Sequence, residues 1–204
     1  MTVINQKDVQ SLRDVKNLTK VAVLGVIAFF IMAFEFPLPF FASFLKIDFS
    51  DVPALLAGFA LGPWAGAGVE VLKNILHAIF KNQTAFIGEA ANLLTGILFV
   101  VPASYVYWMN KNRNTAIIGM LLGTIVMAVG MSLANYFVFI PLYQKVLNIP
   151  MDVIVSLGTK ANPRVVDLKT LIVYSILPFN VLKGLMLSLV TLIIYKKISV
   201  LLHK

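Results

Sequence analysis

Three groups of polar residues stand in strongly apolar surroundings, where their types and spacing suit them to bind a ligand. The first is the loop 45–53, which carries two acids, a base and a hydroxyl between two apolar segments. The second is Asn180 with Lys183, which share one face of a helix because they are three positions apart. The third is Asn135, in the preceding apolar segment. Amide and ammonium groups that edge an apolar cavity suit a flat, neutral molecule that forms hydrogen bonds.

Each group also has a purely structural explanation. A polar loop between hydrophobic helices most often only connects them, and Asn135 can form a hydrogen bond between helices. Lys183 can extend its ammonium group to the membrane surface, although a lysine at mid-helix costs about 2.5–3.5 kcal/mol on insertion scales. For Glu70 and Glu89 the structural explanation is favoured. Glu70 is three residues from Lys73, which predicts a neutralising pair on one helix, and Glu89 stands near a helix start, where the helix dipole favours an acid.

The sequence carries no recognisable catalytic unit. No base accompanies a nucleophile, and there is no Walker phosphate loop. Cysteine is absent, and the two histidines, His77 and His203, are too far apart in the sequence to indicate a metal cluster. We therefore expect a protein that is not an enzyme, that holds no metal or cofactor and that has no nucleotide site of its own.

The composition is that of an integral membrane protein. Of 204 residues, 59% are hydrophobic and 13% are charged, and the mean hydropathy is +0.89. Soluble domains are typically about 45–50% apolar and about 25% charged. The net charge of +8 could indicate a nucleic-acid partner. However, the basic residues are scattered at the ends of apolar segments, which is typical of membrane topology, so we expect the lipid bilayer and no nucleic acid.

The apolar pattern predicts an all-α protein with six transmembrane helices in one membrane domain, residues 1–204. An amphipathic lead-in over 1–17 is expected to precede the six-helix bundle over 18–200. The expected helices are 18–36, 53–61, 64–80, 85–108, 115–141 and 168–200. Crossing a bilayer core of about 30 Å takes about 20 apolar residues. The second and third helices are shorter because Gly62-Pro63 breaks them, and short membrane helices tend to surround a cavity.

Two of these helices carry a pattern on one face. Glu89, Asn92 and Thr95 follow one another at spacings of three, which places them on one side of the fourth helix. In the fifth helix, Gly119 and Gly123 form a small-residue pattern that is typical of close packing between membrane helices.

The basic residues predict the orientation. With six crossings, both termini lie on one side together with the Gly62-Pro63 turn and the 111–114 loop. That side holds nine basic residues, and the opposite side holds five when the long 142–168 connection is discounted. Because short cytoplasmic loops are rich in lysine and arginine, we expect both termini in the cytoplasm and the 45–53 loop outside.

Five sequence stretches together resemble a known family. They are residues 45–55 (LKIDFSDVPAL), 61–66 (LGPWAG), 69–74 (VEVLKN), 135–137 (NYF) and 180–183 (NVLK). The chain resembles, over about residues 15–200, the substrate-binding S components of energy-coupling factor (ECF) vitamin transporters, and most closely the riboflavin-specific ones. The resemblance implies a multi-pass protein of a prokaryotic cell membrane with a vitamin site that opens outward. It also implies a membrane T component and two ATPase subunits as partners.

The resemblance further implies that riboflavin is the transported ligand. The residues that match the family's ligand contacts are Leu45, Lys46, Asp48, Gly88, Asn135, Asn180 and Lys183. Another flavin such as FMN, another vitamin, or a stand-alone vitamin facilitator that needs no ATPase are the alternatives. One departure concerns the first helix, where S components often show Ala-x-x-x-Ala for T-component docking and this chain spaces its small residues differently.

Overall fold

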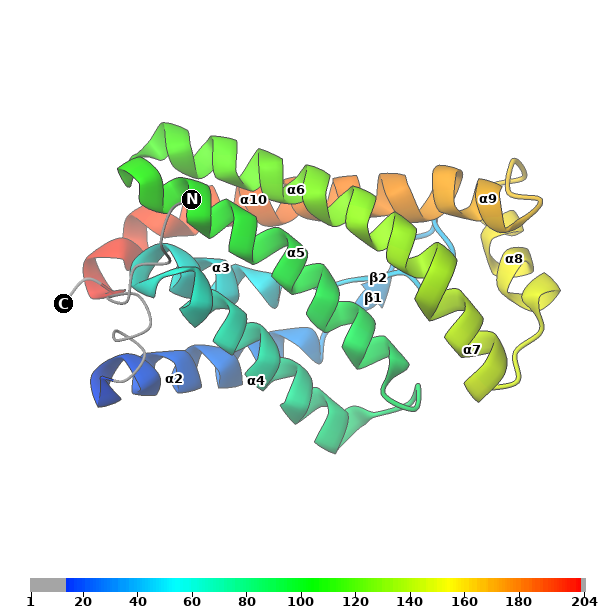
Figure 1. Ribbon diagram of the computed structural model, residues 1–204, viewed down its shortest axis with the longest axis horizontal. Coiled ribbons are helices and arrows are strands. Elements are labelled where there is room, and N and C mark those ends of the chain that lie inside the picture. The colour runs from blue at the N-terminus through cyan, green and yellow to red at the C-terminus, as the bar shows by residue number, and fades with distance from the viewer. Residues whose placement is uncertain (1–13, 203–204) are drawn as a thin grey trace.

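The computed structural model describes residues 14–202, with side chains for residues 14–195. Its helices form one elongated bundle (Figure 1). The helices are α2 (Val15–Met32), α3 (Asp51–Leu61), α4 (Pro63–Lys81), α5 (Ile87–Asn110), α6 (Arg113–Ala134), α7 (Ile140–Val146), α8 (Met151–Thr159), α9 (Leu168–Leu171) and α10 (Leu177–Leu202). Two π-helical turns, η1 (Asn135–Phe139) and η2 (Ile172–Ile176), join α6 to α7 and α9 to α10. The expected lead-in lies largely outside the described residues.

An all-α membrane protein is confirmed, with one small exception. Within the described residues, four helical stretches are long and apolar enough to cross a membrane. These are Val15–Met32, Ile87–Asn110, Arg113–Val146 and Leu168–Tyr195. The exception is the antiparallel pair β1 (Phe36–Pro37) and β2 (Lys46–Ile47), in which Phe36 opposes Ile47. This pair closes the loop between α2 and α3, and so it positions the polar segment that the sequence singled out.

The predicted break between the two short helices is confirmed at Gly62. Its φ of +116° is a backbone conformation that other residues rarely adopt, and Pro63 begins α4, where its missing N–H costs nothing. The N-terminal end of α2 and the C-terminal end of α10 lie at the same end of the bundle as this turn (Figure 1). α7–α9 lie at the opposite end, and the strands lie in that half of the bundle, beyond the C-terminal end of α2 (Figure 1).

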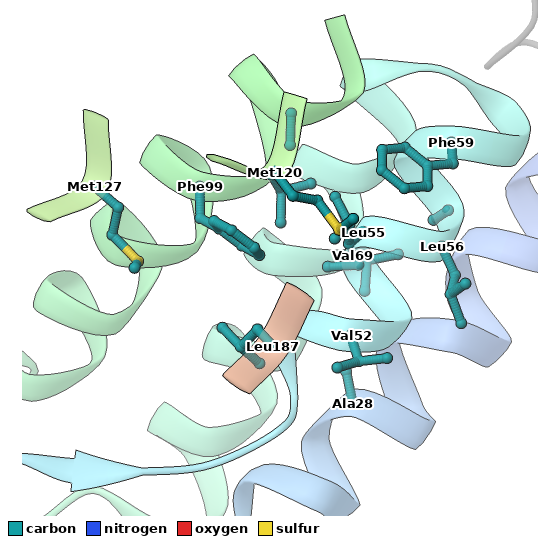
Figure 2. Close-up of a cluster of buried hydrophobic side chains, with 14 of the residues drawn as sticks. Ala28, Val52, Leu55, Leu56, Phe59, Val69, Phe99, Met120, Met127 and Leu187 are labelled. Atoms are coloured by element: carbon teal, nitrogen blue, oxygen red, sulfur yellow. The ribbon is translucent and has the colours of Figure 1, made fainter. Parts of the chain in front are cut away.

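The apolar core surrounds α3. Every residue of this 11-residue helix except Ala60 is buried. Figure 2 shows Leu55 and Leu56 of α3 among Val69, Phe99, Met120 and Leu187, which come from four other helices. The shortness of α3 is therefore compensated by contacts on all sides, as expected for a helix that does not face lipid.

The small-residue pattern of α6 packs as predicted. A Cβ on Gly119 would lie 2.4 Å from the carbonyl oxygen of Ala103, and a Cβ on Gly123 would lie 2.5 Å from that of Phe99. Both carbonyls belong to α5, so the two glycines let the backbones of α5 and α6 approach closely.

A second apolar cluster ties the α2–α3 loop to the far end of the bundle. Its buried members are Ala42, Ile140, Ile154, Val155, Val165, Leu171, Ile172 and Ile176. The backbone N–H of Ala42 also donates to Ser175 Oγ in η2, at 3.1 Å. The long connection predicted over 142–168 is thus folded against the loop, and its helix α8 closes that end of the bundle.

Candidate ligand-binding site

A cavity of about 310 Å³ opens at the end of the bundle that carries the strands. Small-molecule sites have volumes of about 300–1,000 Å³. The last turns of α2, α4 and α6 and the first turns of α5 and α10 contribute to its wall, together with the α2–α3 loop, η1, α7 and α8. The apolar and aromatic lining residues are Met32, Phe44, Leu45, Ala91, Met131, Ile140, Tyr143, Ile149, Ile154, Leu157 and Phe179.

The structure brings together six of the seven residues that the sequence singled out. The residues that line this one cavity are Leu45, Lys46, Gly88, Asn135, Asn180 and Lys183. They come from the loop, from the start of α5, from η1 and from α10, so segments up to 138 residues apart in the sequence meet here. Asp48 does not line the cavity. It lies behind Lys183, with an exposed fraction of 2%.

The two asparagines are held in fixed orientations by their own helices. Asn135 Nδ2 donates to the carbonyl of Met131 at 2.8 Å, and Asn180 Nδ2 donates to that of Ile176 at 2.9 Å. The amide group of Asn135 therefore donates within its own helix, and not to another helix as considered from the sequence. Each bond leaves the side-chain carbonyl oxygen to accept from a ligand. Asn135 begins the π-helical turn η1, and such turns are frequent at functional sites.

Lys183 does not extend to the membrane surface. Its side chain is 3% exposed, and its Nζ lies 3.1 Å from Asp48 Oδ2 and 3.3 Å from Asp51 Oδ2. Burial raises the pKa of Asp48, but the ammonium groups of Lys183 and Lys73 and the bonds from Ser50 outweigh burial and hold that pKa below its usual range. Asp48 is thus ionised, and it positions the Lys183 ammonium group beside the cavity.

The predicted Glu70–Lys73 pair exists, at 2.8 Å, but it is not self-contained. Lys73 is completely buried, and its Nζ also donates to Ser50 Oγ at 2.8 Å and to Asp51 Oδ1. Lys73 therefore neutralises its own helix, as expected, and also has partners outside it. Lys73 fastens the start of α3 to α4, and the loop 45–53 is held by buried charges rather than merely solvated.

A second polar cluster lines the cavity and was not among the predicted site residues. Glu89, assigned only a structural role from the sequence, lines the cavity with His77, Thr84, Asn92 and Thr95. Its Oε1 lies 3.0 Å from His77 Nδ1, and its Oε2 accepts from Thr84 Oγ1 at 3.1 Å. The spacing of Glu89, Asn92 and Thr95 was the signal that could have placed them on the cavity wall.

The rim carries an ion pair across the strands. Lys46 Nζ lies 2.6 Å from Glu35 Oε1, with the lysine side chain 41% exposed. Nearby, Lys81 Nζ donates to the carbonyl of Ala33 at 3.0 Å, which ties the end of α4 to the beginning of the loop. Charged groups thus lie at the mouth of the cavity and amides lie below them. The aromatic side chains of the wall are therefore the main apolar surface for a ligand.

This fold and cavity are those of a membrane subunit that captures a small molecule. The family described as "ECF transporter, substrate-specific component" matches residues 16–195, and the chain belongs to that family. It is therefore a multi-pass membrane component of a bacterial ECF transporter, and it is not an enzyme.

Named relatives and a solved structure agree with the family. The chain is 37% identical to riboflavin transporter RibU of Staphylococcus aureus (strain TCH60) over 184 residues, which cover 90% of each chain. It is 38% identical to riboflavin transporter FmnP of Bacillus subtilis (strain 168) over 187 residues, 91% of this chain and 93% of that one. A solved S component of a bacterial ECF transporter superposes with a TM-score of 0.74 at 34% identity, over 93% of this chain and 98% of the other.

Proposed function

We propose that this chain is the riboflavin-binding subunit of an ECF importer, which takes the vitamin from outside the cell. The observation that carries the proposal is the meeting of Asn135, Asn180 and Lys183 on one aromatic-walled cavity. Relatives at 37% and 38% identity are named riboflavin transporters, and the similarity extends over nine-tenths of the chain.

The two polar parts of the cavity match the two polar parts of riboflavin. The pyrimidine edge of the flavin ring alternates carbonyls with an N–H. An ammonium group such as Lys183 can donate to the carbonyls, and the side-chain oxygens of Asn135 and Asn180 can accept from the N–H. The ribityl chain carries hydroxyl donors, for which the Glu89 carboxylate is the matching acceptor. Phe44, Tyr143 and Phe179 provide aromatic surface for the ring.

The energy for uptake is supplied by partners in this proposal, namely a membrane T component and two ATPase subunits. The sequence has no Walker loop, so the chain has no phosphate-binding motif with which to drive uptake. We also propose six crossings, with α3 and α4 added to the four long spans, and both termini in the cytoplasm. The cavity then faces outward, because it lies at the end of the bundle opposite the Gly62-Pro63 turn.

FMN is the competing ligand. Lys46 and Lys81 both line the cavity near its mouth, and a phosphate group would find cations there. The test is a titration of the purified protein with riboflavin, FMN, thiamine and biotin, followed by flavin fluorescence. Saturable quenching by riboflavin at lower concentration than by FMN supports the proposal. Saturable binding of thiamine or biotin without quenching of flavin would show that the ligand is assigned wrongly.

Vesicles test the role of the partners. The chain alone should bind riboflavin without ATP-dependent accumulation, and addition of the T component and ATPases should confer it. Rapid equilibration of riboflavin across vesicles that contain only this chain would instead identify a stand-alone facilitator.

A further inference from the structure

Five ionisable side chains form one buried cluster between α3, α4, α10 and the loop before α3. They are Asp48, Asp51, Glu70, Lys73 and Lys183, and none is more than 3% exposed. Lys183 contacts Asp48 and Asp51, and Lys73 contacts Asp51 and Glu70. The cluster is therefore continuous, and only its Lys183 end reaches the cavity.

The charges of this cluster do not balance. Three carboxylates and two ammonium groups give a net charge of −1 when every member is ionised. A buried charge without a partner is strongly unfavourable, and in practice the group becomes neutral instead. Both lysines contact two carboxylates each, so protonation of one carboxylate is the change that leaves all their contacts in place.

Glu70 is the carboxylate with the fewest donors. Asp48 accepts from Lys183 and from both the N–H and the hydroxyl of Ser50, and Asp51 contacts both lysines. Among the described residues, neither carboxylate oxygen of Glu70 has a hydrogen-bond partner, and its one ion-pair contact is that of Oε2 with Lys73.

Among the described residues, the one ion pair that Glu70 makes is with Lys73. The charged groups that face it are Lys73 on its own helix, Asp51 on α3 and Lys183 on α10. On α5 it meets Gly96, where a Cβ would lie 2.0 Å from Glu70 Oε2. Asn74, one turn further along α4, has a buried side-chain oxygen that also lacks a partner within the described residues. Within the described residues, this part of α4 thus presents buried acceptors without a donor.

We propose that Glu70 binds a proton and is a neutral carboxylic acid in the folded protein. The five-residue cluster is then neutral as a whole, and Lys183 keeps its ammonium group at the cavity. The ligand of this site is a proton rather than a metal ion. The site does not depend on which vitamin occupies the cavity.

Infrared spectroscopy of the purified full chain tests this directly. A protonated carboxylic acid has a C=O stretch above the amide I band that shifts downward in D₂O. We expect this band in the wild type, its loss in Glu70→Gln and its retention in Glu89→Gln, the matched change of the other buried glutamate. Absence of the band from the wild type, or its survival in Glu70→Gln, would overturn the proposal.

Stability gives a second, independent readout. Glutamine has the shape and neutrality of protonated glutamate, so Glu70→Gln should unfold at the temperature of the wild type or above it and bind riboflavin within a few-fold of it. A large loss of thermal stability in Glu70→Gln would show that Glu70 is an ionised partner of Lys73. If the wild type lacks the infrared band and sodium ions raise its unfolding temperature, the site binds a cation instead. Either result would refute the protonated state.

Discussion

Replacement of Lys183 by methionine has two effects that the structure separates. The change removes the donor proposed for the pyrimidine edge, which costs about 1–3 kcal/mol, and more where charge is involved. It also leaves Asp48 and Asp51, at 3.1 and 3.3 Å from Lys183 Nζ, without that partner. Loss of one partner of a buried ion pair costs about 3–5 kcal/mol. The stability loss is therefore expected to exceed the direct loss in binding.

A second substitution isolates the binding term. Asp48→Asn removes the carboxylate that Lys183 balances, while Asp51 keeps Lys73. The double variant Asp48→Asn/Lys183→Met should therefore regain most of the thermal stability lost by Lys183→Met. It should still bind riboflavin roughly ten- to a hundredfold more weakly than Asp48→Asn alone, because about 1.4 kcal/mol is a factor of ten in Kd.

Riboflavin fluorescence quenching and thermal unfolding of the same preparations measure the two terms. Lys169→Met, at an exposed lysine of α9, is the matched control and should change neither. Lys73→Met is unsuitable as a control, because this lysine is fully buried with three partners. If the double variant binds riboflavin as tightly as Asp48→Asn, Lys183 does not contact the ligand and the reasoning fails.

Three further variants test other parts of the structure. Glu89→Gln should weaken riboflavin binding about tenfold, as expected for a lost charged hydrogen bond. Binding of lumiflavin, which lacks the ribityl chain, should be almost unchanged. Equal losses of affinity for both flavins would place the carboxylate at the ring. Gly119→Leu should sharply lower the unfolding temperature, because a Cβ would lie 2.4 Å from a backbone carbonyl oxygen. Gly68→Ala should be tolerated, because its Cβ would lie 3.4 Å from its nearest neighbour. Similar unfolding temperatures for the two variants would contradict the close α5–α6 packing. Ser175→Ala removes the acceptor for the Ala42 N–H. Hydrogen exchange at that amide should therefore accelerate, and riboflavin should dissociate faster. An unchanged exchange rate would mean that this bond does not hold the loop.

Local chemistry was sufficient to predict several features from the sequence. The Gly62-Pro63 break depends only on the backbone limits of these two residues. Asn135, Asn180 and Lys183 were recognisable as site candidates because polar groups in an apolar helix need partners. The family resemblance added Leu45, Lys46 and Gly88, which the structure places on the same cavity.

Other features depend on contacts that the sequence does not display. Lys73 had an adequate partner three residues away, so nothing in its own helix indicated that it also reaches Ser50 and Asp51. His77 and Glu89 lie on different helices, and their pairing requires the way in which α4 and α5 pack. The direction of Asp48, toward Lys183 and away from the cavity, is set by the fold of the whole loop.

The length of α3 limits how close to the outer membrane face the bound molecule can lie. At about 1.5 Å per residue, 11 residues span at most about 17 Å of a bilayer core of about 30 Å. If the Gly62-Pro63 turn lies at the inner face, as in the proposed orientation, Asp51 at the other end of α3 lies at least about 13 Å below the outer face. Lys183, which contacts Asp51, lines the cavity at that depth. In the proposed orientation, a molecule bound there therefore lies more than a third of the way across the bilayer core, and the packed helix α3 separates it from the inner face.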